Sequence, residues 1–281
     1  MEFRTLIGAD ALQGLLGQAG LAVVDCRFDL MDPGAGRKAY LEAHIPGASF
    51  ADLNLDLSAP VGPATGRHPL PAPEALAARL GTLGIGNDTQ VIAYDESNGS
   101  FAARLWWLLR WAGHGAAAVL DGGFKAWSAG GFALESGEAQ IQARTFTPRI
   151  QPRTVVSTAE LEQALATGEA LLVDARAPER FAGMVEPIDP VAGHVPGAMS
   201  HPLTANLGSD ARFLPAAILK QRWLERLGGR APERVIAMCG SGVTACHNLL
   251  SLEVAGLTGA KLYAGSWSEW IRDPRRPVAR G

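Results

Sequence analysis

The amino-acid sequence predicts an α/β protein made of two copies of one domain, each a mostly parallel sheet with helices on both faces. Two observations support this prediction. Several short motifs occur twice along the chain, and short apolar runs alternate with amphipathic segments. The length of 281 residues exceeds that of a typical single domain, so there is room for two hydrophobic cores.

The internal repeat consists of four motifs that recur in the same order and with nearly constant spacing. One short match could arise by chance, but four in order indicate a duplicated domain. The pairs are LAVVDCR (21–27) with LLVDAR (171–176), HIPGA (44–48) with HVPGA (194–198), VIAYD (91–95) with VIAMC (235–239), and LDGGFKAW (120–127) with LYAGSWSEW (262–270).

The second copy shows the alternation of strands and helices most clearly. Ser157 is a good N-cap, and Glu160 three residues later completes a capping box. Strands that alternate with helices favour a parallel sheet buried on both faces. We expect strands over 170–174, 197–200, 234–238 and 260–263, and helices over 157–166, 216–227 and 243–255.

The predicted domain limits are 1–140 and 154–281, with a linker over 141–153. The segment 135–153 is polar and only weakly periodic, which is typical of a connection between domains. Within it, the stretch 144–147 resembles a strand and is expected to pack back on the first domain.

Composition excludes several classes of protein. The chain is 47% hydrophobic and 19% charged, with a net charge of −3, so we expect no nucleic-acid or membrane partner. No apolar run approaches the roughly 18 residues of a membrane span, and the N-terminus lacks a signal-peptide pattern, so a cytoplasmic location is expected. The three cysteines are too sparse for a disulfide framework and form no C-x-x-C pair, so no metal site is predicted.

Cys239 is the candidate nucleophile, because it lies between an apolar strand and a helix, at the start of the loop CGSGVT. In such a loop, backbone N–H groups and the helix N-terminus converge on the first side chain and stabilise a thiolate. The alternative is a buried, inert thiol. The predicted anion-binding loop comprises Gly240, Ser241, Gly242, Val243 and Thr244, in which the glycines permit unusual φ angles and the hydroxyls add donors.

Phosphoryl chemistry is disfavoured at this loop. Cysteine phosphatases and arsenate reductases use C-x5-R, in which the arginine binds the oxyanion through two hydrogen bonds. Here the corresponding position is Ala245.

Together, the tandem copies, the HIPGA and HVPGA motifs and the CGSGVT loop resemble the rhodanese superfamily, and in particular its two-domain sulfurtransferases. The loop has the form seen in 3-mercaptopyruvate sulfurtransferases. The resemblance implies that Cys239 takes a sulfur from a small donor, forms a persulfide, and passes the sulfur to cyanide, a thiol or a thioredoxin-like acceptor. It implies no metal or organic cofactor.

Two alternatives stay open beside the 3-mercaptopyruvate reading. Enzymes of this family often accept thiosulfate as well, so the chain could be a thiosulfate sulfurtransferase. It could also be a persulfide carrier that delivers sulfur to a partner protein without turning over small acceptors.

The first copy has Asp95 where the second has Cys239. A carboxylate cannot form a persulfide, so the first domain is predicted to be catalytically silent.

Arg180 is the predicted donor-binding residue, because Arg180–Gly183 (RFAG) matches a substrate-binding R-F-x-G motif of the family. Mercaptopyruvate enzymes usually carry a second arginine in E-P-x-R, but this chain has Glu186–Asp189 (EPID) there. Arg104 of the first copy is one candidate replacement, although it could simply lie beside core aromatic residues.

The resemblance also suggests a proton relay of Asp56 and His68 with Ser241. The alternative for the two first-copy residues is an ordinary polar loop, because 60–73 is rich in proline and glycine. His44 and His194 are expected to be structural, since the silent copy retains one.

Overall fold

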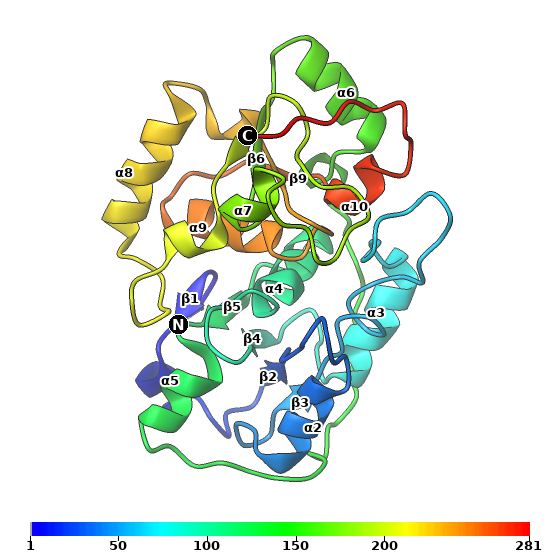
Figure 1. Ribbon diagram of the computed structural model, residues 1–281. Helices are drawn as coiled ribbons and strands as arrows, with labels where there is room; N and C mark the ends of the chain where they lie inside the picture. Colours follow the sequence, from blue (N-terminus) through cyan, green and yellow to red (C-terminus); the bar gives the residue numbers. More distant parts are fainter. Residues whose placement is uncertain (1) are drawn as a thin grey trace. The chain divides into compact units, whose positions relative to one another are not determined.

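The fold is described from a computed structural model that covers residues 2–281 (Figure 1). The chain divides into two compact units. Of the described residues, unit 1 comprises 2–59, Pro71–Gln151 and Gly208–Phe213, and unit 2 comprises Pro60–Leu70, Pro152–Leu207 and Leu214–Gly281. Each unit therefore includes a short segment from the opposite half of the sequence.

Unit 1 is built on a five-stranded sheet in the order β1-β5-β4-β2-β3, in which every neighbouring pair is parallel. The two central strands are runs of buried apolar residues, as a sheet covered on both faces requires. Its elements are β1 (Leu6–Ile7), α1 (Ala9–Gln13), β2 (Leu21–Asp25), α2 (Ala35–Glu42), β3 (Ser49–Phe50), α3 (Pro73–Thr82), β4 (Gln90–Tyr94), α4 (Ala102–Trp111), β5 (Ala117–Leu120) and α5 (Gly123–Ala129).

Unit 2 repeats this topology with the parallel order β7-β6-β8-β9. A parallel bridge between Val155 and Leu262 of β9 takes the place that β1 has beside β5. Its elements are α6 (Thr158–Ala166), β6 (Leu171–Asp174), α7 (Pro178–Phe181), β7 (Met199–Ser200), α8 (Ala216–Leu227), β8 (Val235–Met238), α9 (Ala245–Val254), β9 (Lys261–Leu262) and α10 (Ser266–Trp270), with short 3₁₀ turns at Pro152–Thr154, Leu203–Asn206 and Pro232–Arg234.

Each sheet has a hydrophobic core on its two faces. In unit 1, Val23 and Ile92 form a core with Leu12 of α1 and Trp127 of α5. Neighbouring residues such as Ala93 point to the opposite face, where α4 packs against β4 and β5 (Figure 1). In unit 2 the equivalent core is formed by Leu172 of β6, Ile236 of β8, Leu161 of α6, and Trp267 and Trp270 of α10.

Two of the repeated motifs make the same side-chain contacts in both units. Asp25 and Arg27 form a buried ion pair with two parallel hydrogen bonds, and Asp174 and Arg176 form the same pair. His44 stacks on Tyr40, and its counterpart His194 stacks on Phe181.

Most predicted elements of the second copy are present within two residues of their expected ends. The capping box of Ser157 and Glu160 is confirmed, and α8 spans the predicted range. The helix expected over 243–255 begins later, at Ala245, because 243–244 still belongs to the loop after β8. The four-residue helix α7 was not predicted.

The connection between the two halves is largely attached to unit 1. Arg144 donates its backbone N–H to Gly81 O, and Phe146 is buried, so 144–147 packs on unit 1 as expected. It does not form a strand, because this contact is not continued into a ladder. The predicted limits of the two domains and of the linker remain predictions. In the structure, residues 60–70 belong to unit 2 and residues 208–213 belong to unit 1.

Candidate active site

The Cys239 loop, defined as residues 239–244, connects β8 to α9 at the carboxyl end of the sheet of unit 2. Strand β8 has β6 on one side and β9 on the other, so the loop begins at the centre of the sheet. Ligand sites in parallel α/β sheets lie at this end of the strands. Cys239 is 2% exposed, and Gly242 donates its backbone N–H to Cys239 Sγ at 3.1 Å.

The loop is held by the segment that follows β9. Ser266 Oγ accepts the backbone N–H of Cys239 at 3.1 Å and donates to Tyr263 O. Ser266 has a φ of 53°, which a residue with a side chain rarely adopts. Gly242 has a φ of 78°, and a Cβ there would lie 2.3 Å from Ala264 O, so only glycine fits.

Two guanidinium groups converge on Gly240, the residue after the candidate nucleophile. A Cβ at Gly240 would lie 3.3 Å from Arg67 Nη2 and 3.5 Å from Arg180 Nη1. Arg180 comes from α7, and Arg67 comes from the segment 60–70 that belongs to unit 2. The loop is therefore flanked by two cationic side chains that could bind an anionic donor.

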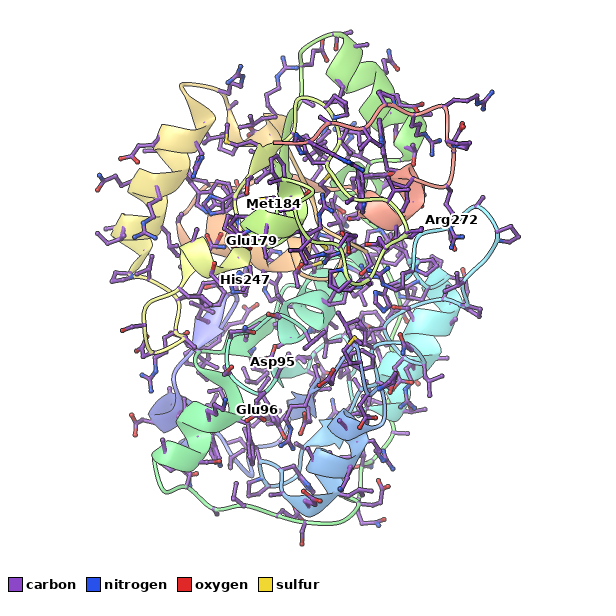
Figure 2. All side chains as sticks on the ribbon, viewed as in Figure 1. Asp95, Glu96, Glu179, Met184, His247 and Arg272 are labelled. Atoms are coloured by element: carbon purple, nitrogen blue, oxygen red, sulfur yellow. The ribbon has the colours of Figure 1, made fainter. Side chains whose placement is uncertain are left out.

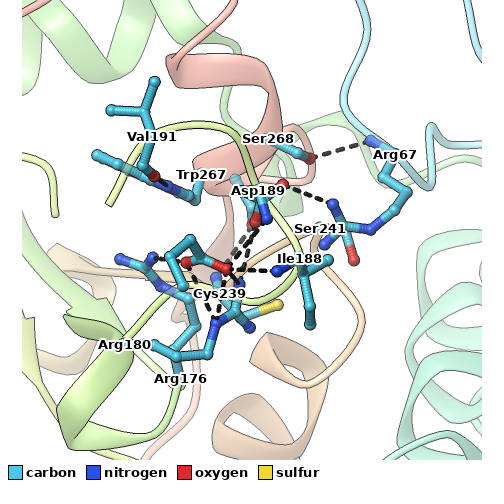
Figure 3. Close-up of polar contacts among 12 residues, drawn as sticks. Arg67, Arg176, Arg180, Ile188, Asp189, Val191, Cys239, Ser241, Trp267 and Ser268 are labelled. Atoms are coloured by element: carbon cyan, nitrogen blue, oxygen red, sulfur yellow. Dashed lines mark hydrogen bonds and ion pairs between the residues drawn. The ribbon is translucent and has the colours of Figure 1, made fainter. Parts of the chain in front are cut away.

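Two carboxylates hold these arginines. Glu186 accepts from Arg180 Nε and Nη2, at 3.1 and 2.7 Å. Partial burial by itself would raise the pKa of Glu186, but hydrogen bonds from Arg180 and from the backbone of Asp189 outweigh it and lower that pKa. Asp189 bridges the arginines, with Oδ1 2.6 Å from Arg67 Nη1 and Oδ2 3.0 Å from Arg180 Nη2 (Figure 3).

His68 and Ser241 lie together, with His68 Nδ1 2.7 Å from Ser241 Oγ. Both are buried. The sequence predicted these two residues as members of one relay, and the structure brings them into hydrogen-bond contact within unit 2.

Asp56 and Arg104, the other two predicted site residues, belong to unit 1. Asp56 forms an ion pair with Arg79 at 2.7 Å and accepts the backbone N–H of Asp52. Arg104 is fully buried in α4 and donates to Leu57 O. Their roles, like those of the residues around Cys239, stay predictions.

The loop after β4 is the counterpart of the Cys239 loop, and Asp95 lies at its start (Figure 2). The carboxylate of Asp95 accepts four backbone N–H groups, from Ser97, Gly99, Phe101 and Ala102, at 2.8 to 3.2 Å. Burial raises the pKa of Asp95, although these four hydrogen bonds oppose the shift. The loop amides of unit 1 are thus occupied by a side chain of the same loop.

Sequence reasoning missed four residues that shape this site: Arg67, Glu186, Asp189 and Ser266. The sequence carried one signal for Asp189, which stands where mercaptopyruvate enzymes usually have an arginine. A carboxylate that becomes buried at such a position needs a cationic partner. Nothing local in the sequence indicates that Arg67 is that partner, since 122 positions separate the two residues.

Comparisons with known proteins show the family to which the chain belongs. The family described as Rhodanese-like domain matches residues 8–130 and 157–273. A Pseudomonas aeruginosa protein named as a probable 3-mercaptopyruvate sulfurtransferase is 52% identical over 283 residues, which covers 100% of both chains. A Mycobacterium tuberculosis protein named as a putative thiosulfate sulfurtransferase, SseB, is 40% identical and covers 99% of this chain and 98% of its own.

The solved structure of SseA, a 3-mercaptopyruvate sulfurtransferase from Escherichia coli, superposes with a TM-score of 0.81 at 32% identity, over 95% of this chain and 100% of that one. The fold and the cysteine loop thus define a sulfurtransferase with tandem rhodanese-like domains. The chain belongs to the 3-mercaptopyruvate sulfurtransferase family of rhodanese-like enzymes, and its activity is of the 3-mercaptopyruvate or thiosulfate type.

Two absences apply to residues 2–281. No helix in this range has both the length and the apolar character needed to span a lipid bilayer. Over the same described range, no cluster of three or more His, Cys, Asp or Glu side chains could hold a metal ion.

Proposed function

We propose that the chain transfers sulfur from 3-mercaptopyruvate, through a persulfide on Cys239, to a small thiol or cyanide. The single observation that carries this proposal is the position of Cys239. Its sulfur accepts a backbone N–H of its own loop, and the next residue, Gly240, is approached by two guanidinium groups.

In the first half-reaction, the Cys239 thiolate attacks the sulfur of the donor. The donor C–S bond breaks, its electron pair stays on carbon as the enolate of pyruvate, and a proton then gives pyruvate. The terminal sulfur of the new persulfide is negatively charged, so the loop N–H groups stabilise it. We assign the proton transfer to the His68–Ser241 pair, whose side chains share a hydrogen bond.

In the second half-reaction, the acceptor attacks the terminal sulfur of the persulfide. The S–S bond breaks, its electron pair returns to Cys239 as thiolate, and the acceptor carries the sulfur away. Cyanide gives thiocyanate and a thiolate gives its own persulfide. No oxidant, reductant or cofactor enters either half-reaction.

Thiosulfate is the second candidate donor. This donor is supported by the relative that is 40% identical to the chain and is named as a putative thiosulfate sulfurtransferase. With thiosulfate, the Cys239 thiolate takes the outer sulfur and sulfite leaves with the bonding electron pair.

The test is mass spectrometry of the protein after incubation with each donor separately, followed by turnover assays with cyanide. We expect a gain of one sulfur atom on Cys239 and complete loss of transfer in the Cys239→Ser variant, which is nearly isosteric and should fold. No persulfide with either donor would refute the proposal. A persulfide that neither cyanide nor a small thiol discharges would identify a carrier for a protein acceptor instead.

A further inference from the structure

We propose that Ser266 is a positioning residue for the Cys239 nucleophile. Its hydroxyl holds the backbone N–H of Cys239 and thereby fixes the direction in which the thiol points. This inference rests on the proposed function, because it assigns the residue that orients the thiol that carries the sulfur.

The first observation is that both hydrogen bonds of the Ser266 hydroxyl are made to the backbone. Ser266 is fully buried. Its Oγ accepts the N–H of Cys239 at 3.1 Å and donates to Tyr263 O at 2.9 Å. A serine hydroxyl has a single hydrogen, so none is left for the sulfur of Cys239. Any effect of Ser266 on the thiol therefore passes through the backbone of Cys239.

The second observation is the backbone conformation of Ser266. Its φ of 53° lies in the left-handed region, where a side chain costs free energy and glycine does not. Within residues 2–281, Ala211 is the one other non-glycine residue with a positive φ. Strained residues of this kind persist where the surrounding structure holds them, and they cluster at functional sites. Since glycine would suit this backbone better, the position holds a serine for its hydroxyl.

The third observation comes from unit 1, where Gly123 occupies the position that Ser266 has in unit 2. The two residues after each position donate their backbone N–H groups to the first two residues of the neighbouring loop. These hydrogen bonds run from Phe124 to Asp95 and from Lys125 to Glu96 in unit 1, and from Trp267 to Cys239 and from Ser268 to Gly240 in unit 2. The duplicated domain thus supplies an internal comparison for Ser266.

The comparison shows that the left-handed conformation belongs to both units and the hydroxyl to one of them. Gly123 has a φ of 59°, close to that of Ser266. A Cβ on Gly123 would lie 2.5 Å from Asp95 O and 2.8 Å from Ser97 N, so no side chain fits there. The strained serine therefore occurs beside the loop that begins with the thiol, and glycine occurs beside the loop that begins with Asp95.

The hydrogen bond from Cys239 to Ser266 fixes the plane of the peptide bond that precedes Cys239, because that bond is rigid. The direction of the cysteine side chain follows, and its sulfur accepts the N–H of Gly242 at 3.1 Å. Without the hydroxyl, the buried N–H of Cys239 loses this acceptor, which favours a shift of the loop. A shift of about 1 Å in a reacting group can lower a rate about 10²-fold.

The test compares Ser266→Ala with Ser266→Gly in steady-state transfer from mercaptopyruvate to cyanide. Both variants remove the hydroxyl, but only glycine suits the left-handed backbone. We expect kcat to fall at least about tenfold in both, with KM for the donor changed less than about threefold. Urea unfolding should show the glycine variant to be the more stable of the two. Transfer then follows the hydroxyl, whereas stability follows the backbone.

Ser251→Ala is the matched control, because Ser251 is also a fully buried serine of unit 2. Its Oγ accepts the Nε1–H of Trp223 at 2.9 Å and donates to Asn248 O at 2.8 Å. The substitution therefore removes one accepted and one donated hydrogen bond, as Ser266→Ala does, but within α9 rather than beside the loop. Its urea midpoint should fall while kcat stays unchanged.

An unaltered kcat in Ser266→Gly would overturn the inference. So would a glycine variant that keeps more transfer than the alanine variant in proportion to its stability, since a purely structural role predicts that order. Persulfide formation in the unmodified protein is measured separately by mass. If the persulfide forms and Ser266→Gly keeps its kcat, only this inference fails. If no persulfide forms with either donor, the proposed function itself fails.

Discussion

Gly242 shows how much of the site depends on single residues. Its backbone N–H reaches Cys239 Sγ only because the residue adopts a left-handed φ against Ala264. A side chain here meets both a backbone penalty and a steric one, so the loop conformation is tied to this glycine.

We expect Gly242→Ala to lower the free energy of unfolding by about 1–3 kcal/mol, since the strained φ and the contact with Ala264 O both oppose a Cβ. Sulfur transfer should fall about 10²-fold, as when one oxyanion donor is lost. Urea unfolding and steady-state assays measure the two effects. Gly256→Ala is the control, because Gly256 has a φ of 72° with no atom within 4 Å of its Cβ position, and it should keep full transfer.

The sequence identifies those site residues whose signal is local. Cys239 is recognisable because strand, glycines and helix are adjacent in the chain. Arg67 is not, because its importance comes from the ion pair with Asp189 that only the folded chain creates. Arg104 was considered as the missing arginine from its place after the loop of unit 1, but its contacts at Leu57 could not be inferred from sequence.

At the scale of elements, the two loops that follow β4 and β8 both direct backbone N–H groups at the side chain of their first residue. That residue differs between the two loops. In unit 2 the loop begins with a thiol that accepts Gly242 N–H. In unit 1 it begins with Asp95, whose carboxylate accepts four N–H groups. This supports the prediction that unit 1 is silent, because its anion-binding amides are already used.

The raised pKa of Asp95 gives the stability a defined pH dependence. Between the usual aspartate pKa and the raised one, native Asp95 holds a proton that the unfolded chain has released, so this contribution to stability falls as pH rises. We therefore expect the difference in unfolding free energy between the unmodified protein and Asp95→Asn to be largest near pH 4 and to shrink toward pH 7. Urea titrations across this range measure it, and a difference that grows with pH would contradict the expectation.

Element boundaries were predictable where the sequence carries a local signal, either a run of apolar residues or a capping box. Strands β6 and β8 were found because each is a buried apolar run, and α6 was found because Ser157 and Glu160 cap it. Helix α7 was not predicted, because four residues are too few to show helical periodicity. The stretch 144–147 has strand-like residues but lacks a neighbouring strand to complete a ladder.

At the scale of the whole molecule, the duplication was evident from four repeated motifs, and the sheets repeat the same strand order. What the repeat could not reveal is the exchange of segments. Residues 60–70 belong to unit 2 and residues 208–213 to unit 1, where Phe213 donates to Asp121. These contacts join positions far apart in the sequence, and neither segment has a counterpart among the repeated motifs.

Gly66 tests the attachment of segment 60–70. A Cβ at Gly66 would lie 2.5 Å from Gly265 O and 3.0 Å from Ser268 Oγ, so Gly66→Ala should push Arg67 and His68 away from the Cys239 loop. We expect a loss of transfer of about tenfold or more, measured by steady-state assays. Gly62→Ala in the same segment meets only an ordinary contact with Thr65 at 3.6 Å and should retain activity; equal losses in both variants would argue against the steric explanation.

The exchange of segments also limits how this gene can be divided. A polypeptide that begins at the second repeat would carry Cys239, Arg180 and Asp189 but neither Arg67 nor His68. Its Asp189 would be left with one of its two cationic partners. The first half of the chain, although predicted to be catalytically silent, therefore supplies Arg67 and His68 to the unit that contains Cys239.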